Sequence, residues 1–152
     1  MSTANTVRVM SNQTPEQFTG SGAITPGHLC YLTSAGLIAV HATAGGDQTR
    51  LFAIEDSHQG SEITDAYVTA TTVQAIHALP GDRLNALLLN GETAVIGSLL
   101  ESGGDGTLRV KDADASVGAI NYNSVVGYAR EAVDMSGSDA VDPSARILIT
   151  VL

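Results

Sequence analysis

Short apolar runs, each bounded by a turn, recur along most of this chain. A Pro-Gly turn stands directly ahead of an apolar run twice, in residues 24–32 and again in residues 78–87. A second pattern, an apolar run that ends at a glutamate, occurs three times, in residues 51–55, 95–101 and 125–131. Glycine occupies 16 positions, and it favours tight turns over long helices. The pattern is therefore typical of a mainly β protein built from short strands.

The predicted strands follow one another closely. They cover residues 29–32, 37–41, 50–55, 66–70, 73–78, 84–89, 93–100, 107–110, 125–133 and 145–152. Asn90-Gly91 is the strongest hairpin signal because both residues tolerate positive φ, so the strands on either side are predicted to pair. Residues 112–124 are ambiguous and are expected to include a helical turn. The apolar segment 147–152 must pair inside a sheet or with a neighbouring subunit. Together these features predict a small β-barrel-like or sandwich domain with Gly-rich turns.

Residues 1–22 differ from the rest of the chain in being rich in Ser, Thr, Asn, Gln and Gly. Such a segment buries too little apolar surface to offset its own ordering entropy, so we predict an extended, flexible N-terminal arm. The alternation of Val7, Arg8 and Val9 suits a short strand that is added to the sheet of a partner. A frayed terminus is the alternative. Residues 23–152 then form the β domain, and a division of this domain into two β units near residue 80 is left open.

The composition limits the classes of partner. Sixteen acidic and seven basic residues give a formal net charge of −9, and the basic residues form no stripe. A phosphate backbone would be repelled, so no nucleic-acid partner is expected. No apolar stretch approaches the ~20 residues of a membrane span, and the N-terminus lacks the pattern of a signal peptide, so no membrane partner is expected. The single cysteine, Cys30, lies in an apolar run and is predicted to be a buried thiol.

No set of residues has the spacing of an active site. The chain contains no H-E-x-x-H motif, cysteine pair, G-x-S-x-G motif or P-loop. Residues 112–116 begin like a calcium loop, but the later positions do not supply its Gly and its bidentate Glu. We therefore expect no enzyme activity, no catalytic residues, no metal site and no cofactor. A small hydrolase is the rival, and a pocket that joins His41, His58 or His77 to a carboxylate would support it.

Five short motifs in residues 24–56 carry a resemblance to a known family. They are Ile24-Thr25-Pro26, the turn at Thr33-Ser34, the run 36–40, the Gly45-Gly46-Asp47 loop and the run 51–56. In these motifs, and in the polar arm ahead of them, the chain resembles the lambda-type trimeric head-decoration (cement) proteins of bacteriophages. The resemblance is close over residues 24–56 and loose elsewhere. The chain departs from the family in being longer and in having Leu51-Phe52 where a Gly is often found.

The resemblance implies a β-tulip fold and a structural role in the virion. It implies a homotrimer, made in the host cytoplasm, that binds the major capsid protein on the outer surface of an expanded capsid. The homotrimer would sit at the threefold positions of the capsid and stabilise the shell against internal DNA pressure. The N-terminal arms of the family clamp neighbouring capsid subunits, often by adding a strand to the shell. By arm position and residue type, the capsid-binding residues carried over to this chain are Thr6, Val7, Arg8, Val9 and Met10 for main-chain pairing, with Phe18 as an apolar anchor.

A carbohydrate-binding or adhesion β-sandwich of a phage tail or fibre is the alternative function. Carbohydrate sites usually present aromatic side chains, and this chain has only four Tyr and two Phe, with no Trp. Tyr122 and Tyr128 lie near one predicted loop and are the candidates for such a site. A packing role is the other interpretation of both residues.

Overall fold

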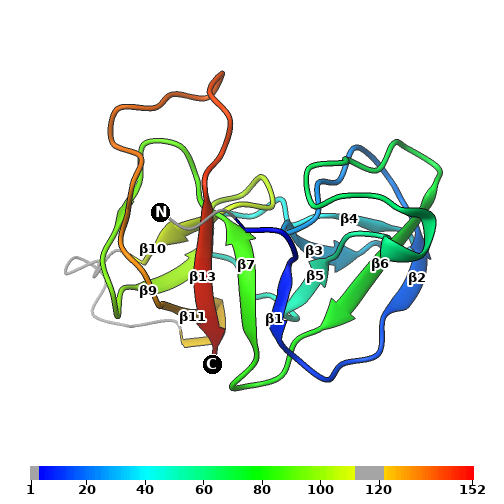
Figure 1. The fold of residues 1–152 in the computed structure, drawn as a ribbon, viewed down its shortest axis with the longest axis horizontal. Helices are drawn as coiled ribbons and strands as arrows, with labels where there is room; N and C mark the ends of the chain where they lie inside the picture. The colour runs from blue at the N-terminus through cyan, green and yellow to red at the C-terminus, as the bar shows by residue number, and fades with distance from the viewer. Residues whose placement is uncertain (1–3, 112–121) are drawn as a thin grey trace.

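Short strands and tight turns make up nearly all of the computed structural model, which describes residues 4–111 and 122–152 (Figure 1). Over these residues it contains thirteen strands in three antiparallel sheets and two 3₁₀ helices, η1 (Ser57–Gln59) and η2 (Tyr122–Ser124). The prediction of a mainly β fold is confirmed, and no sheet of the described residues closes into a barrel. No described helix is long and apolar enough to span a bilayer. The calcium-like segment and most of the ambiguous stretch fall in residues 112–121, outside the described residues.

The five-stranded sheet takes all its strands from residues 16–77. Its order is β2 (Glu16–Thr19), β6 (Thr72–His77), β5 (Leu51–Ala53), β3 (Leu29–Leu32) and β4 (Ile38–Val40). β3 and β4 form the hairpin that residues 33–36 predict, with Gly36 in the left-handed region at φ 77°. An isolated bridge joins Gly20, which follows β2, to Ile38 of β4. The bridge therefore brings the two edges of the sheet together at one end.

The six-stranded sheet takes five strands from the second half of the chain and one from the N-terminal segment. Its order is β1 (Arg8–Met10), β7 (Arg83–Leu87), β13 (Arg146–Val151), β11 (Val125–Ala129), β9 (Leu99–Ser102) and β10 (Leu108–Val110). The apolar C-terminal strand β13 lies between β7 and β11, so the expectation that it pairs inside a sheet is confirmed. The third sheet joins only β8 (Thr93–Ala94) to β12 (Val133–Asp134).

The strand predicted at residues 66–70 and the hairpin predicted at Asn90-Gly91 are both wrong, and the runs predicted as single strands at 93–100 and 125–133 are each divided in two. Residues 66–70 form no strand, because Tyr67 makes only an isolated bridge to Ile24 and Ala70 has a left-handed φ of 64°. The turn at Asn90 and Gly91 does not join a hairpin, although Gly91 has the expected positive φ of 86°. The Asn90 amide donates instead to two carbonyls of a distant loop, those of Asp139 and Asp142, at 2.7 Å each. The flanking strands β7 and β8 pair with β13 and β12 rather than with each other.

The two large sheets share one core. The larger cluster of buried side chains joins Ile147 and Ile149 of β13 to Phe52 of β5 and Ile76 of β6, all with 0% of their surface exposed. A smaller cluster lies within the five-stranded sheet and includes Cys30, whose predicted burial is confirmed. Burial raises the pKa of this thiol to about 12. The chain passes from one sheet to the other between β6 and β7, near the division at residue 80 that the sequence leaves open.

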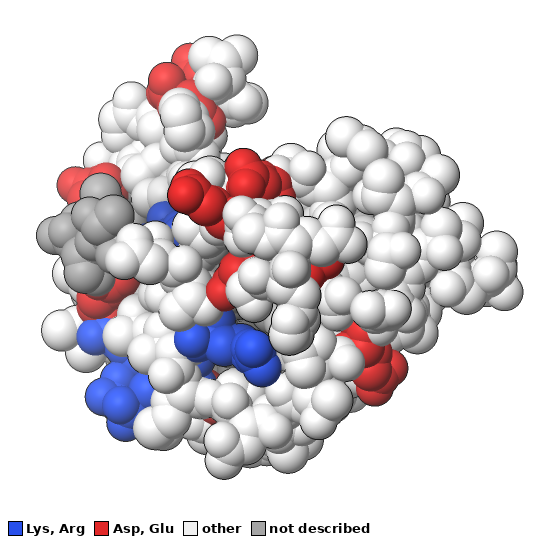
Figure 2. All heavy atoms as spheres, turned by 45° about the vertical axis from the view of Figure 1, so that its right-hand side comes forward, with Lys and Arg blue, Asp and Glu red and all other residues white. Residues whose placement is uncertain are grey.

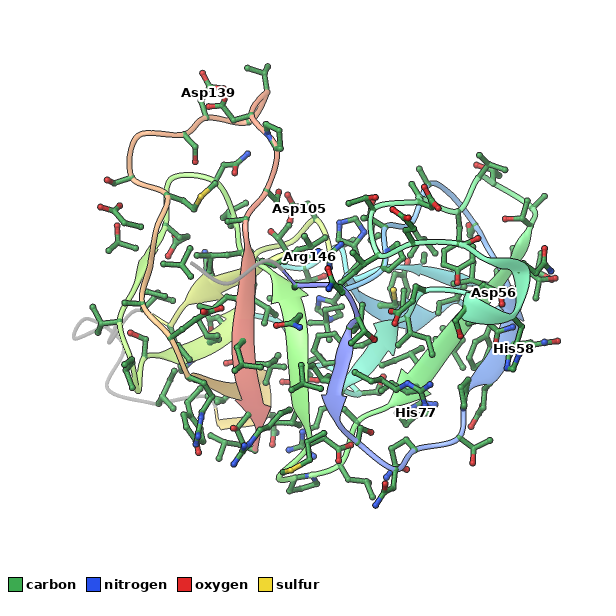
Figure 3. All side chains as sticks on the ribbon, in the orientation of Figure 1. Asp56, His58, His77, Asp105, Asp139 and Arg146 are labelled. Carbon is green, nitrogen blue, oxygen red and sulfur yellow. The ribbon has the colours of Figure 1, made fainter. Side chains whose placement is uncertain are left out.

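Arg146 ties the two sheets together where β13 begins, at the centre of the molecule (Figure 3). Its Nη1 donates to the Pro26 carbonyl at 2.8 Å and its Nη2 to the Ile63 carbonyl at 2.6 Å. Burial lowers the pKa of the guanidinium, and the nearby Glu55 partly offsets this effect. Gly27 lies next to the guanidinium, and a Cβ at residue 27 would stand 2.5 Å from Nη1 of Arg146. A side chain at residue 27 is therefore incompatible with this contact.

Candidate binding surfaces

The N-terminal segment lies against the body of the protein. The Thr6 hydroxyl donates to Glu55 Oε1, and the Val7 amide donates to Glu55 Oε2 at 3.0 Å. Asn85 of β7 donates its side-chain amide to the Thr6 carbonyl and its backbone amide to the Val7 carbonyl, both at 2.8 Å. The Val7 side chain is fully buried in the larger core. Over these residues the structure thus differs from a free arm, because Glu55 and Asn85 satisfy the backbone groups and the core takes the valine.

Strand β1 is the outermost strand of the six-stranded sheet. Among the described strands it pairs with β7 alone, so its other edge presents unpaired backbone groups. Two of its side chains are half exposed, Val9 at 50% and Met10 at 51%. The Arg8 guanidinium turns back to the Gln13 carbonyl at 3.2 Å. Arg8, Val9 and Met10 therefore form an edge that a further strand could extend.

Phe18 lies apart from this edge. It belongs to β2 in the five-stranded sheet, where it pairs with Val73 of β6. Its ring is partly buried against the smaller core cluster. The structure therefore brings Thr6, Val7, Arg8, Val9 and Met10 together and does not bring Phe18 to them.

A turn at residues 79–82 contacts both the end of β1 and the end of β13. The Asp82 carboxylate accepts from the Ser11 hydroxyl at 3.0 Å and from the Leu79 amide at 2.9 Å. The Asp82 carbonyl accepts from the Val151 amide at 2.9 Å. Large apolar side chains are exposed at this end of the sheet, namely Met10 (51%), Leu79 (52%) and Leu152 (44%). We call these three residues the end patch, a feature the sequence does not reveal because its members are far apart in the chain.

Two arginines lie on the outward side of the strands beside the end patch. Strand register places Arg83 of β7 opposite Thr150 of β13, and Thr150 opposite Tyr128 of β11. The pKa of Tyr128 lies below its usual range, because the Thr150 hydroxyl, the Arg130 guanidinium and the charge of Arg83 stabilise the ionised ring. Figure 2 shows Lys and Arg gathered on the lower part of one face, with Asp and Glu mainly above them. Tyr128 thus contributes to a cationic, partly apolar area, and the side chain of Tyr122 lies outside the described part of the chain.

A buried ion cluster lies on the opposite half of the same sheet. Glu101 is 4% exposed and accepts from Arg109 at 2.8 Å and from Lys111 at 2.9 Å. The Ser124 hydroxyl donates to the same carboxylate at 3.0 Å. Burial raises the pKa of Glu101, but the hydrogen bonds from Lys111, Arg109 and Ser124 outweigh this effect and hold the pKa below its usual range. These contacts satisfy the carboxylate and connect β9, β10 and the start of β11, which is a structural role.

His41 and His77 differ in their surroundings. His41 is 5% exposed, and its ring nitrogens bond the Ser102 hydroxyl at 2.8 Å and the Asp47 carbonyl at 2.9 Å. His77 is exposed at the end of β6. No group of three or more His, Cys, Asp or Glu side chains that could hold a metal ion is found in residues 4–111 and 122–152.

A carboxylate and a histidine line one cleft beside β2 and β6. Asp56 and His58 both line this cleft, which has a volume of about 350 Å³ (Figure 3). No hydrogen bond joins the two side chains among the described residues, and η1 holds His58 exposed. Asp56 is 8% exposed, and its Oδ1 atom has no hydrogen-bond partner in residues 4–111 and 122–152. The sequence predicts no site here, because the lining residues come from separate segments.

Comparison with known proteins connects this fold to a phage head protein. No family model matches the chain, and no curated protein sequence matches it. A solved structure, described as the head fiber gp8.5 N base in bacteriophage phi29, is similar with a TM-score of 0.54 and 14% sequence identity. The similarity covers 92% of this chain and 94% of that one. It therefore relates the two folds over nearly their whole length.

Proposed function

We propose that this chain is a structural protein of a bacteriophage head. The observation that carries the proposal is the similarity of its fold to the phi29 head fiber base, over 92% of this chain and 94% of the other. A match confined to one sheet would be expected for many β proteins, whereas this one includes both large sheets. The sequence motifs in residues 24–56 resemble a different family of head proteins, and they support the same general role.

Within this role, the protein decorates the outer surface of an expanded capsid and binds the major capsid protein. The exposed edge of β1 supplies the main-chain groups for pairing with a strand of the shell. The end patch lies beside this edge and supplies apolar surface, with Met10 common to both. The arm therefore binds as an ordered edge strand, anchored by Val7 and Glu55, rather than as a free segment.

A homotrimer would engage three such edges at once. Each edge is only three residues long and offers little affinity alone. Linking three sites raises the apparent affinity by a factor on the order of 10² to 10⁴ without any new kind of contact. Threefold positions on the capsid would match this arrangement, and the bound plaque would hold neighbouring capsid subunits together against internal pressure.

Electron cryomicroscopy of expanded capsids incubated with the purified protein tests the proposal. We expect added density on the outer surface at threefold positions, with β1 and the end patch turned toward the shell. Density in which another face of the protein contacts the shell would contradict the assigned surface. Capsids without added density at saturating protein would contradict the decorating role itself.

A further inference from the structure

An unpaired carboxylate lies between β5 and η1. Asp56 stands at the N-cap position of η1, yet its side chain caps no backbone amide. A carboxylate at this position ordinarily accepts a hydrogen bond from the first turn of the helix. Here the residue is 8% exposed, and its Oδ1 is buried without a hydrogen-bond partner in the part of the chain that the structure describes. A buried acceptor in this condition costs stability, and no donor reaches it among the described residues.

Two adjoining clefts meet at Asp56. Their volumes are about 350 Å³ and about 320 Å³, and both are lined by Asp56, Gln59 and Thr72. Gln17 and Gln74 complete the first cleft, and they stand directly opposite each other on β2 and β6. Directly opposed side chains on paired strands have Cβ atoms about 5 Å apart, so the two amides act on the same part of a ligand.

The second cleft adds hydroxyl groups and an aromatic ring. Ser61 and Thr71 line it, together with Tyr67. The Tyr67 hydroxyl donates to the Ile54 carbonyl at 2.6 Å, which fixes the position of the ring. Fixed aromatic surfaces of this kind pack well against an apolar face of a ligand while the surrounding groups bond its polar edge.

The side chains select one class of ligand. Amides and hydroxyls both donate and accept, and a carboxylate accepts, which matches a row of sugar hydroxyls. No Lys or Arg lines either cleft, so the carboxylate would repel a phosphate or another anion. A metal ion would need several carboxylate or imidazole ligands, and no such group occurs among the described residues.

We propose that the two clefts beside Asp56 form a saccharide-binding site, in which Asp56 accepts a hydrogen bond from a sugar hydroxyl and the Gln17–Gln74 pair bonds its neighbours. This property goes beyond the head-structural role proposed above and does not depend on it. The site lies beside β2 and β6 of the five-stranded sheet, whereas β1 belongs to the six-stranded sheet.

The test is a titration of the isotope-labelled full chain with three neutral trisaccharides, cellotriose, maltotriose and tri-N-acetylchitotriose, followed by amide chemical shifts. We expect at least one of them to shift the amides of residues 56–61 and 71–74, with a Kd on the order of 1 mM. Asp56→Asn should weaken that binding about tenfold, because a charged acceptor makes the stronger hydrogen bond. Asp139→Asn removes the same charge at the far end of the molecule and should bind as the wild type does (Figure 3).

A second variant and a second probe distinguish saccharide binding from a purely structural role of Asp56 and from the binding of a cation. Gln59 is exposed and lines both clefts, so Gln59→Ala should fold normally and still weaken binding several-fold. A purely structural Asp56 would make Asp56→Asn less stable, whereas an unpaired carboxylate predicts a melting temperature that does not fall. The proposal is overturned if none of the three trisaccharides shifts these amides, or if both variants bind as the wild type does. It is also overturned if only Nα-acetyl-lysine amide, a cationic probe, produces the shifts.

Discussion

Gly27 and Arg146 form the most demanding contact at the scale of single residues. Gly27 has a φ of 99°, and a Cβ there would stand 2.5 Å from the guanidinium that joins the two sheets. We expect Gly27→Ala to lose about 1–2 kcal/mol of stability from its backbone conformation. Displacing Arg146 from the Pro26 and Ile63 carbonyls should remove about 1–3 kcal/mol more. Urea unfolding measures both losses together.

Gly36→Ala is the matched control for this prediction. Gly36 has a φ of 77°, and nothing lies within 4 Å of the position its Cβ would take. It should therefore show the backbone loss without the loss of the Arg146 contact. Equal losses in the two variants would mean that Arg146 does not join the sheets in the way described.

His28 makes the stability of the protein depend on pH. Its Nδ1 accepts from the Thr25 amide at 3.1 Å, and burial lowers the pKa of the ring to about 4. Below pH 6.5 the unfolded chain binds a proton that the folded state excludes. The stability that the neutral, buried His28 ring contributes is therefore fully present above pH 6.5, and it is lost as the pH falls from 6.5 to 4. Across this range it amounts to about 3 kcal/mol.

Urea unfolding at several pH values between 7 and 4 checks this dependence. His28→Gln should show a shallower fall in the free energy of unfolding than the wild type over this range. His77→Gln alters an exposed histidine at the end of β6 and should follow the wild-type curve. A His28→Gln curve parallel to that of the wild type would assign the pH dependence to other groups.

Met10 is the residue common to the β1 edge and the end patch. Met10→Asp places a charge where we expect apolar contact, and it should lower the affinity for capsids at least tenfold, about 1.4 kcal/mol. Its stability should change by less than about 0.5 kcal/mol, because the side chain is half exposed. Val141→Asp, at an 89% exposed position in the loop before β13, should change neither quantity. Binding of Met10→Asp equal to that of Val141→Asp would remove the end patch from the interface.

At the scale of the elements, the two edges of the six-stranded sheet should behave differently on the capsid. β1 and β10 are both edge strands, whereas β13 is paired on both sides. Amide hydrogen exchange of the free protein should be slowest in β13. On capsid binding the β1 amides should gain protection, and the β10 amides should not. Protection gained at β10 instead would place the interface at the opposite edge of the sheet and contradict the assignment to β1.

Elements set by local sequence could be predicted, and long-range pairing could not. The β3–β4 hairpin follows from the turn that the sequence predicts at residues 33–36, and the burial of β13 follows from its apolar sequence. The turn at Asn90 also has the local conformation its sequence predicts. However, its side chain bonds the loop at residues 139–142, and the strands on either side pair elsewhere. A dipeptide carries no information about a loop some fifty residues away, so the hairpin prediction failed.

The candidate sites also combine features that the sequence predicts with features that only the folded structure shows. The sequence predicts a short strand near residues 7–9 from their alternation, and the structure has β1 at Arg8–Met10, paired with β7 of the same chain. The sequence does not show that Glu55 and Asn85 hold this segment, nor that Val7 is in the core. Asp56 is ordinary in sequence, since an acidic residue before a short helix is a common cap. Only the folded structure shows that it caps nothing and lies between two clefts.

At the scale of the whole molecule, the surfaces are distributed in a way that suits a protein docked by one end. Strand β13 runs from the loop that carries Asp139 and Asp142 to the end patch, with Arg83 beside the patch. The loop projects from the opposite end of the sheet (Figure 1). In the proposed arrangement, with the end patch against a shell, the acidic loop would face solvent, and a net charge of −9 would help to keep decorated particles dispersed.

Co-sedimentation of the purified protein with expanded, undecorated capsids tests the central claim most directly, when it is combined with a mass measurement of the free protein. The account predicts saturable binding in multiples of three copies per site, and the loss of this binding in Met10→Asp but not in Val141→Asp. Protein that stays in the supernatant at every concentration, and that has the mass of a monomer, would contradict the proposed role in the phage head.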